Sequence, residues 1–560
     1  MKDGYIRVAS ASIDTLIGNV KHNANEIKKV LKETREKKAQ VVVFPELVLS
    51  GYTLEDLFLQ NRLLNECLVQ LEEIMKDTKG HQQIVVIGLP FHYQNNLYNV
   101  SAVLYDGSIL GIVPKYHIPN YNEYYEGRRF TPCFEDNIEI ELFGQIVLFG
   151  RKVVFACQNL PSFTLGVEIC EDLWLPNAPS NELALNGATV ICNTSASNEL
   201  TAKKDYRRNL VSMQSAKLVS GYVYSNAGSG ESTTDVVFSG HHLICENGTI
   251  INESTGFDAE VIYGDLDVEK LVSERRKMTT YQSHHDYDYV YFDMDLIDIE
   301  TNHYYDPHPF VPSNPKLREL RCKEVFEIQT RGLMQRLKAT HINKVVIGIS
   351  GGLDSTLALL VCVMAFEKLG YDTQIKLLNA SDFGVPQLRP RVVIVGIRKE
   401  ENKYFMYPEG NPQMAPTVGN ALYDLMAENK WKGAKKWAQN ANKIAPTLVG
   451  GSKKHGGPDL GPVRARNAWA ELGVDGRGVA NMAPEPDFEG MPRLTSRMLA
   501  RIQGFPDTWT FGKKKTAACR MIGNAFPPPV AKAVGEKIKE CLENECTDCE
   551  RTISLSRKIV

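Results

Sequence analysis

Short apolar runs typical of strands alternate with amphipathic, helix-like stretches from the N-terminus to about residue 273. The clearest helical pattern covers Val20–Lys37. The strand-like runs include Tyr5–Ala11, Ala39–Phe44, Gln83–Gly88, Ser101–Leu104, Thr164–Ile169 and Thr189–Cys192. Strands and helices in alternation form layered folds in which helices cover sheets. We therefore predict an α/β fold for this region.

The composition changes after this region. Residues 276 to about 315 are rich in Tyr, His, Asp and Pro, and they end on the Pro-rich run 307–312. Because proline favours extended backbone before it, we predict an interdomain linker here. A long Gly- and Lys-rich stretch of weak periodicity lies farther along. The elements predicted after the linker are a helix from Leu317, a buried strand at Lys344–Ile349, a helix at Ser355–Leu369 and a strand at Val392–Ile397.

Composition excludes several classes of protein. Of the 560 residues, 43% are hydrophobic and 23% are charged, which is typical of globular proteins rather than disordered, collagenous or disulfide-scaffold chains. The net charge of −3 gives no overall attraction to nucleic acid or membranes, and no apolar run approaches the roughly 20 residues of a membrane span. With no export signal, the twelve cysteines are expected to be reduced thiols in a cytoplasm. We expect no metal site, because Cys541, Cys546 and Cys549 lack a fourth ligand.

Three short segments each place one reactive side chain after a predicted strand. They are Phe44-Pro45-Glu46-Leu47, Val113-Pro114-Lys115-Tyr116-His117 and Gly166-Val167-Glu168-Ile169-Cys170-Glu171-Asp172. A thiol can attack an amide carbonyl, a carboxylate can move protons, and an ammonium can stabilise the oxyanion. A nearby cation is also expected to lower the pKa of the thiol. Taken singly, a cysteine after a strand is more often a buried structural residue.

In these segments the chain resembles the carbon–nitrogen hydrolase (nitrilase) superfamily, and most closely the glutaminase domain of glutamine-dependent NAD⁺ synthetases. The resemblance implies an α-β-β-α sandwich over residues 1–275. It also implies that Glu46 is the general base, Lys115 the oxyanion cation and Cys170 the nucleophile. Glu123 would position the lysine. L-Glutamine would be bound by Tyr52, Tyr121, Glu171, Ser197 and Lys203.

A second motif, Ser350-Gly351-Gly352-Leu353-Asp354-Ser355, follows the predicted strand at 344–349 and leads into the predicted helix. Small residues and a helix N-terminus favour phosphate binding. The motif resembles the ATP-pyrophosphatase loop of the NAD⁺ synthetases, a Rossmann-like domain that uses ATP and Mg²⁺ to amidate deamido-NAD⁺. The resemblance stops near residue 372, which puts ATP binding and NAD⁺ synthesis by this chain alone in doubt. The implied ATP-binding residues are Ser350, Gly351, Gly352, Asp354 and Ser355.

From about residue 370 the chain resembles a different family, the C5-cytosine DNA methyltransferases. The motifs that carry this resemblance are Gln387-Leu388-Arg389-Pro390-Arg391, Ile502-Gln503-Gly504-Phe505-Pro506 and Gly523-Asn524-Ala525-Phe526-Pro527. It implies an α/β fragment with a target-recognition region. Gln387, Arg389 and Arg391 would approach DNA, and Asn524 would lie near S-adenosylmethionine.

Between these motifs, residues 430–466 hold nine Lys or Arg and one acid, with Trp431, Trp437 and His455 interleaved. Such a stretch suits weak DNA binding through phosphates, and a solvated surface loop is the alternative. The family's Pro-Cys nucleophile and main cofactor loop are missing, because the only Pro-Cys is Pro132-Cys133. We therefore expect neither methyl transfer nor strong binding of S-adenosylmethionine.

The sequence thus describes a chimera of two truncated enzymes joined near Lys368–Asp372, with apolar surface exposed over 320–543. The leading hypothesis is a glutamine-hydrolysing protein of the NAD⁺ synthetase type, expected to form a homo-oligomer. The alternatives are a methyltransferase-derived DNA-binding protein and a non-catalytic assembly subunit. The expected domains are a glutaminase (1–275), a linker (276–316), an ATP-binding fragment (317–372), a methyltransferase fragment (373–545) and a tail (546–560).

Overall fold

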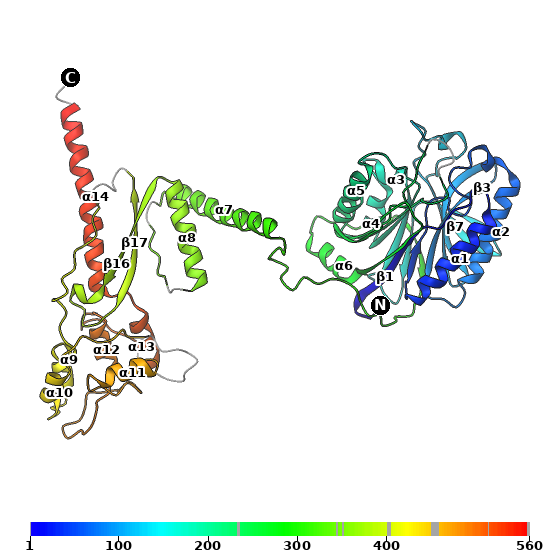
Figure 1. The fold of residues 1–560 in the computed structure, drawn as a ribbon. Helices are drawn as coiled ribbons and strands as arrows, with labels where there is room; N and C mark the ends of the chain where they lie inside the picture. Colours follow the sequence, from blue (N-terminus) through cyan, green and yellow to red (C-terminus); the bar gives the residue numbers. More distant parts are fainter. Residues whose placement is uncertain are drawn as a thin grey trace. The chain divides into compact units, whose positions relative to one another are not determined.

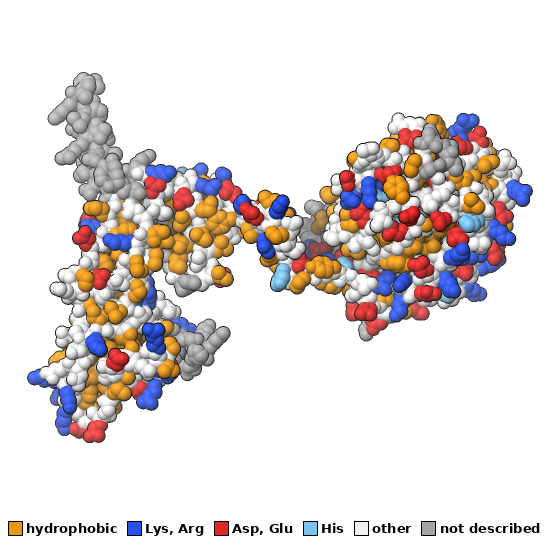
Figure 2. Space-filling model, in the orientation of Figure 1, with side chains coloured by type: hydrophobic (Ala, Val, Ile, Leu, Met, Phe, Trp, Pro, Cys, Tyr) orange, Lys and Arg blue, Asp and Glu red, His pale blue; other side chains and the backbone are white. Residues whose placement is uncertain are grey.

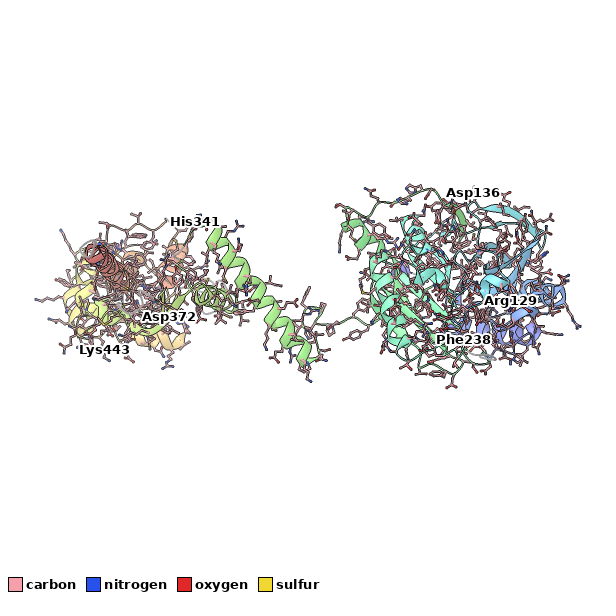
Figure 3. The ribbon with its side chains drawn as sticks, turned by 90° about the horizontal axis from the view of Figure 1, so that it is seen from above. Arg129, Asp136, Phe238, His341, Asp372 and Lys443 are labelled. Carbon is pink, nitrogen blue, oxygen red and sulfur yellow. The ribbon has the colours of Figure 1, made fainter. Side chains whose placement is uncertain are left out.

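The computed structural model describes residues 2–231, 236–342, 345–349, 352–399, 405–449, 459–512 and 514–556. The chain divides into two compact units, Met1–Pro307 and His308–Val560. Arg129 and Phe238, both labelled in Figure 3, belong to the first unit, and Asp372 and Lys443 belong to the second. The part of the chain that is described contains no helix long and apolar enough to cross a membrane.

Two sheets form the centre of the first unit. The first sheet has eight strands, which in spatial order are β14 (Val261–Asp267), β1 (Tyr5–Ala11), β2 (Val41–Val43), β3 (Ile84–Tyr93), β4 (Asn96–Tyr105), β5 (Ser108–Pro114), β7 (Gln145–Phe149) and β6 (Ile138–Leu142). The second has seven, which are β13 (Thr249–Glu253), β12 (Leu243–Glu246), β11 (Gly221–Asn226), β10 (Val190–Ser195), β9 (Thr164–Ile169), β8 (Val153–Cys157) and β15 (Asp288–Phe292).

Helices cover the outer faces of both sheets, as Figure 1 shows. On the first sheet lie α1 (Val20–Glu36) and α2 (Asn61–Asp77), and on the second lie α4 (Pro179–Leu185) and α5 (Lys203–Leu218). The remaining short elements of this unit are η1 (Lys2–Gly4), η2 (Glu55–Leu59), η3 (Glu126–Arg128), α3 (Glu171–Trp174) and α6 (Val268–Lys277). The predicted α-β-β-α sandwich is therefore confirmed.

Three apolar layers hold this sandwich together. Side chains alternate along each strand, so that Ile6 and Val8 of β1 enter the core between the sheets, while Ala9 faces the helices. Leu71 of α2 fills the outer layer of the first sheet, and Val211 of α5 fills that of the second. Both faces of the central strands are thus buried, which explains why they appear in the sequence as continuous apolar runs.

The predicted linker is wrong over its middle part. Strand β15 pairs in parallel with β8, from Asp288 opposite Val153 to Phe292 opposite Cys157. Phe292 and Met294 are buried in the core between the two sheets. After Asp288 the strand consists of Tyr289, Val290, Tyr291 and Phe292, a run of aromatic and β-branched residues that is typical of strands and that the high local content of His, Asp and Pro obscured.

The second unit contains helices and one hairpin. Its elements are α7 (Pro315–Thr340), α8 (Leu353–Lys368), β16 (Tyr371–Asn379), η4 (Ala380–Phe383), β17 (Pro390–Arg398), α9 (Val418–Met426), α10 (Ala434–Asn440), α11 (Val463–Ala470), α12 (Ser496–Ile502), α13 (Lys515–Asn524) and α14 (Pro528–Ser556). The antiparallel pair of β16 and β17 packs against α14. The predicted tail from 546 is wrong as a separate segment, because α14 continues to Ser556.

The Gly- and Lys-rich region of weak periodicity is more compact than its sequence suggests. Helices α9 to α13 enclose an apolar cluster that includes Trp431, Trp437 and Trp469, each less than a tenth exposed. The indole N–H of Trp431 donates to the carbonyl of Phe488 (2.8 Å), and that of Trp437 donates to the carbonyl of Gly473 (3.1 Å). These aromatic side chains pack with one face of α9, formed by Val418, Leu422 and Met426.

The predicted buried strand at 344–349 is not present in the described residues. Residues 345–349 belong to no strand, and Val346 is 99% exposed. A strand needs neighbours to bury its two faces, and the described part of this unit offers it no parallel partner. Apolar side chains of α8 and the hairpin are exposed as well, including Leu353, Leu360, Ile375 and Val392, and Figure 2 shows hydrophobic surface over this region. The expected exposure of apolar surface is therefore confirmed.

Candidate active site

The three reactive side chains predicted at strand ends come together between the two sheets. Glu46 follows β2, Lys115 follows β5 in the same sheet, and Cys170 follows β9 in the other sheet. All three are buried, with exposures of 1%, 0% and 5%. The backbone N–H of Glu46 donates to the carbonyl of Ser195, which lies at the end of β10 (3.3 Å). Strand ends from both sheets thus meet at one point.

Both carboxylate oxygens of Glu46 are engaged. Its Oε1 accepts hydrogen bonds from the Nζ of Lys115 (2.6 Å) and the side-chain amide of Asn99 (2.6 Å). Its Oε2 accepts from the backbone N–H of Ala196 (2.9 Å). These contacts fix the carboxylate in one orientation, as a general base requires.

Lys115 is held between two carboxylates. Its Nζ donates to Glu46 and to both oxygens of Glu126, at 2.7 and 2.9 Å. Burial alone would lower the pKa of this lysine, but Glu126 and Glu46 together outweigh burial and raise it well above its ordinary value. Lys115 is therefore a permanent ammonium group, suited to stabilise an oxyanion.

The second glutamate of the site is Glu126 rather than Glu123. Glu126 is buried, and its carboxylate also accepts from the hydroxyl of Tyr52 (2.7 Å). The carboxylate of Glu123 instead accepts from the side-chain amide of Asn198. The predicted role of Glu123 in positioning the lysine thus disagrees with the contacts. The two glutamates are three residues apart in Glu123-Tyr124-Tyr125-Glu126, and nothing in that pattern tells which one turns inward.

Cys170 has a backbone conformation that is unusual for a residue with a side chain. Its φ is 43° and its ψ is −97°. Its N–H donates to the carbonyl of Thr194 (3.0 Å) and to Oδ1 of Asn193 (3.2 Å), and these bonds hold it in place. Backbone strain of this kind costs about 1–3 kcal/mol and clusters at functional sites. It marks Cys170 among the buried cysteines of the unit.

The thiol of Cys170 is not the preformed thiolate that the sequence suggested. Burial is the largest influence and raises its pKa, and the charge of Glu46 raises it further, while Lys115 lowers it only in part. The expectation of a depressed thiol pKa is therefore wrong. Lys115 is already neutralised by two carboxylates, so little of its charge is left to stabilise a thiolate. The proton of Cys170 has to be removed during the reaction.

The residues predicted to bind glutamine surround this centre. The hydroxyl of Tyr121 donates to Oε1 of Glu171 (2.8 Å), next to Cys170 in the chain. The Nζ of Lys203 donates to Asn198 and lies 5.2 Å from the ring centre of Trp174. Ser197 is buried and its hydroxyl accepts from Arg207 (3.3 Å). Tyr52 joins the site through Glu126.

Asn99 is a further residue of the site, because its side-chain amide donates to both Glu46 and Glu126. Nothing in the sequence marks it, so it was not predicted.

Of the residues predicted to bind ATP, the three that the structure describes do not form a phosphate cradle. Ser350 and Gly351 lie outside the described residues. Gly352 precedes α8, Asp354 is exposed, and the hydroxyl of Ser355 donates back to the carbonyl of Gly352 (3.0 Å). The segment 345–349, which leads into this turn, does not form the expected strand. The described residues therefore do not fit ATP and Mg²⁺, and no step is derived through them.

Two of the methyltransferase-like residues, Gln387 and Arg389, form a buried polar network rather than an exposed DNA-contacting surface. Arg389 donates to the backbone carbonyls of Leu448 (2.7 Å) and Gly523 (2.6 Å), and Gln387 donates to Oε1 of Gln503 (2.8 Å). Both side chains are almost fully buried. Arg391 donates to the carbonyl of Pro390, and Asn524 is exposed. The described side chains of Gln387 and Arg389 thus connect three distant motifs, and His455 lies outside the described residues.

Comparisons with known proteins divide the chain in the same way. Residues 7–276 match the carbon-nitrogen hydrolase family, residues 325–378 match NAD synthase, and residues 352–540 match C-5 cytosine-specific DNA methylase. The last two matches overlap at 352–378, a stretch that contains the predicted join. The two predicted resemblances are confirmed, because the N-terminal part is homologous to glutamine-dependent NAD⁺ synthetases and the C-terminal part to C5-cytosine methyltransferases.

Two relatives illustrate this division. A glutamine-dependent NAD(+) synthetase of Mycobacterium bovis is 39% identical over 379 residues, which cover 66% of this chain and 56% of the relative. The type II methyltransferase M.NaeI of Lentzea aerocolonigenes is 55% identical over 188 residues, covering 33% of this chain and 45% of that protein. The chain thus spans about half the length of the curated relatives it matches. A solved glutamine-dependent NAD(+) synthetase from Cytophaga hutchinsonii, 21% identical, has a TM-score of 0.42 and covers 65% of this chain and 52% of that one.

Proposed function

We propose that this protein hydrolyses L-glutamine to glutamate and ammonia at Cys170. The observation that carries the proposal is the buried group of Glu46, Lys115 and Glu126, which interacts electrostatically with a strained cysteine at the neighbouring strand end. Homology with glutamine-dependent NAD⁺ synthetases supports glutamine as the substrate. Ten free thiols in the described part of the chain support the cytoplasm as the compartment.

The geometry supports a thioester mechanism. Glu46 takes the proton of the Cys170 thiol as the sulfur attacks the side-chain carbonyl carbon of glutamine, and the carbonyl oxygen becomes an oxyanion beside Lys115. Glu46 then gives its proton to the departing nitrogen, which leaves as ammonia when the C–N bond breaks. Water, deprotonated by Glu46, attacks the thioester, and the C–S bond breaks to release glutamate and restore the thiol.

The proposal makes a direct prediction about the purified full-length chain. Incubation with L-glutamine should release ammonia and glutamate in equal amounts, without ATP or deamido-NAD⁺, because none of the proposed steps needs them. An enzymatic ammonia assay and a separate glutamate assay measure both products. A folded protein that releases no ammonia above the rate without enzyme would rule out this function.

The proposal does not extend to the amidation of deamido-NAD⁺. That reaction belongs to relatives of which the match covers 56%, and the described residues around Gly352 do not form a nucleotide site. Methyl transfer from S-adenosylmethionine is not proposed either. Methyl transfer needs the nucleophilic cysteine of a Pro-Cys motif. The described cysteine side chains of the second unit do not follow a proline, and all of them lie within helices: Cys322, Cys362, Cys519 and Cys541.

DNA binding by the second unit is a second candidate function. Lys430, Lys432, Lys435 and Lys436 are exposed, on a segment homologous to DNA methylases. Trp431 and Trp437 are buried in the core beneath them, so that they are unable to stack on bases. Exposed lysines above buried tryptophans favour contacts to DNA phosphates, and such contacts carry no sequence preference.

Such contacts predict a salt-dependent affinity. The logarithm of the affinity for duplex DNA should fall linearly with the logarithm of the salt concentration. The double variant Lys435→Gln, Lys436→Gln should make that slope less steep by roughly two, because each lost phosphate contact contributes about 0.9. Fluorescence anisotropy of a labelled duplex at several salt concentrations measures this slope. Lys532→Gln, at another exposed lysine, is the matched control. An affinity that does not change with salt would contradict this function.

A further inference from the structure

Asp172 lies two residues after Cys170, in the first turn of α3, and takes no part in the chemistry described above. Its side chain is buried, with an exposure of 2%. A carboxylate with so little contact with water needs hydrogen-bond donors from the protein. The donors that Asp172 uses come from the two segments that carry the ammonium and the thiol.

The two oxygens of Asp172 connect these segments. Oδ1 accepts the backbone N–H of His117 (2.8 Å), two residues after Lys115. Oδ2 accepts the backbone N–H of Ile169 (3.1 Å), directly before Cys170, and the N–H of Tyr116 lies at 3.5 Å from it. One side chain therefore binds the backbone on the C-terminal side of Lys115 and on the N-terminal side of Cys170.

This connection spans two sheets that share no ladder of hydrogen bonds. Lys115 follows a strand of the eight-stranded sheet, and Cys170 follows a strand of the seven-stranded sheet. Apolar packing holds the sheets together but does not prevent small slides of one past the other, whereas a pair of charge-assisted hydrogen bonds fixes a relative position. A misplacement of about 1 Å between reacting groups can cost about a hundredfold in rate.

We propose that Asp172 is a positioning residue that keeps the ammonium of Lys115 aligned with the thiol of Cys170. The proposal rests on the proposed hydrolysis of glutamine and adds a residue to it. Asp172 contacts neither substrate nor reacting atoms, so its effect should appear in kcat more than in KM.

The ionised form of Asp172 is the one that can accept at both oxygens. Burial is the largest influence on its pKa, the charge of Glu168 adds to it, and together they raise the pKa to about 7. The charged and titratable groups that face it are Glu168 on β9, Lys115 after β5 and Cys133. Because protonation removes an acceptor, the contribution of Asp172 should be present above about pH 7 and lost as the pH falls through that value.

Two variants test the proposal through the pH profile of kcat. Asp172→Asn places an amide N–H where an acceptor is needed, so kcat should fall by about tenfold to a hundredfold, and the inflection near neutral pH should disappear. Glu168→Gln is the matched buried variant. It removes the negative charge that raises the pKa of Asp172, so the same inflection should persist but move to lower pH. An Asp172→Asn enzyme that keeps the wild-type kcat and pH profile would overturn the proposal.

A second measurement does not depend on turnover. Amide hydrogen exchange should accelerate in Asp172→Asn at His117 or at Ile169, because the amide group replaces one of the two acceptor oxygens, while exchange in β12 stays as in the wild type. If the wild type releases no ammonia, the proposed function fails, and the exchange result still decides whether Asp172 holds the two segments. Unchanged exchange at both amides would contradict the proposal even in an active enzyme.

Discussion

Replacing Cys170 by alanine should lower ammonia release from glutamine by at least about a thousandfold, because the loss of a covalent nucleophile removes the whole thioester route. Of the described cysteines, Cys170 is the one whose thiol interacts electrostatically with both Glu46 and Lys115. The variant should keep its fold, because a sulfur-to-hydrogen change leaves Glu46 and Lys115 paired. Steady-state ammonia release and thermal unfolding of both proteins measure the two effects.

Cys192→Ala is the matched control. Cys192 is also fully buried, and it lies on β10, which neighbours β9, but burial alone determines its raised pKa. This variant should keep kcat within about threefold of the wild type, since it changes the core rather than the reacting groups. If ammonia release persisted in Cys170→Ala, another nucleophile would be responsible and the mechanism would be wrong.

Replacing Glu126 by glutamine should lower kcat by roughly a hundredfold. The change leaves Glu46 as the single carboxylate on a buried ammonium, so the pKa of Lys115 should fall towards the value that burial favours. It also removes the charged acceptor of the Tyr52 hydroxyl. A weaker or misplaced cation stabilises the oxyanion less, and the loss of one such group typically costs about a hundredfold to a thousandfold.

Glu123→Gln makes the same change in charge three residues away and is therefore the control for Glu126→Gln. Its carboxylate contacts Asn198, which in turn binds Lys203, so the expected effect is on KM for glutamine, with kcat kept within about threefold. Full kinetics of both variants, with circular dichroism to check the fold, separate the two glutamates. A larger loss of kcat in Glu123→Gln than in Glu126→Gln would show that these contacts do not govern catalysis.

Much of the N-terminal unit can be predicted from sequence because its signals are local. The predicted runs Tyr5–Ala11 and Thr164–Ile169 coincide with β1 and β9, since continuous apolar residues between polar turns are enough to define a buried strand. The three reactive residues also lie in local motifs after predicted strands, and the resemblance of those motifs to the carbon–nitrogen hydrolases singled them out. Strand β15 was missed because its pairing with β8 joins residues far apart in the chain.

The second unit shows where local pattern fails. The predicted helix at Ser355–Leu369 is present as α8, and a turn at Gly370, with a φ of 89°, leads from it into β16. The predicted strand before Gly352 has no neighbour among the described residues to bury it, and residues 345–349 belong to no strand. Trp431 and Trp437, which the pattern suggested for contact with DNA, are instead used to fill a core. Whether an apolar or aromatic residue is covered depends on which elements lie beside it.

The sequence by itself determined several strands of the first unit, such as β1 and β9, and the carboxylate, ammonium and thiol that follow strands, because these follow from the chemistry of consecutive residues. The tertiary structure alone decided that Glu126 rather than Glu123 pairs with Lys115, that burial keeps Cys170 protonated, and that Asp172 joins two sheets. Each of these depends on distances between groups brought together by folding. Electrostatic interaction and desolvation act through space, so residue spacing along the chain does not specify them.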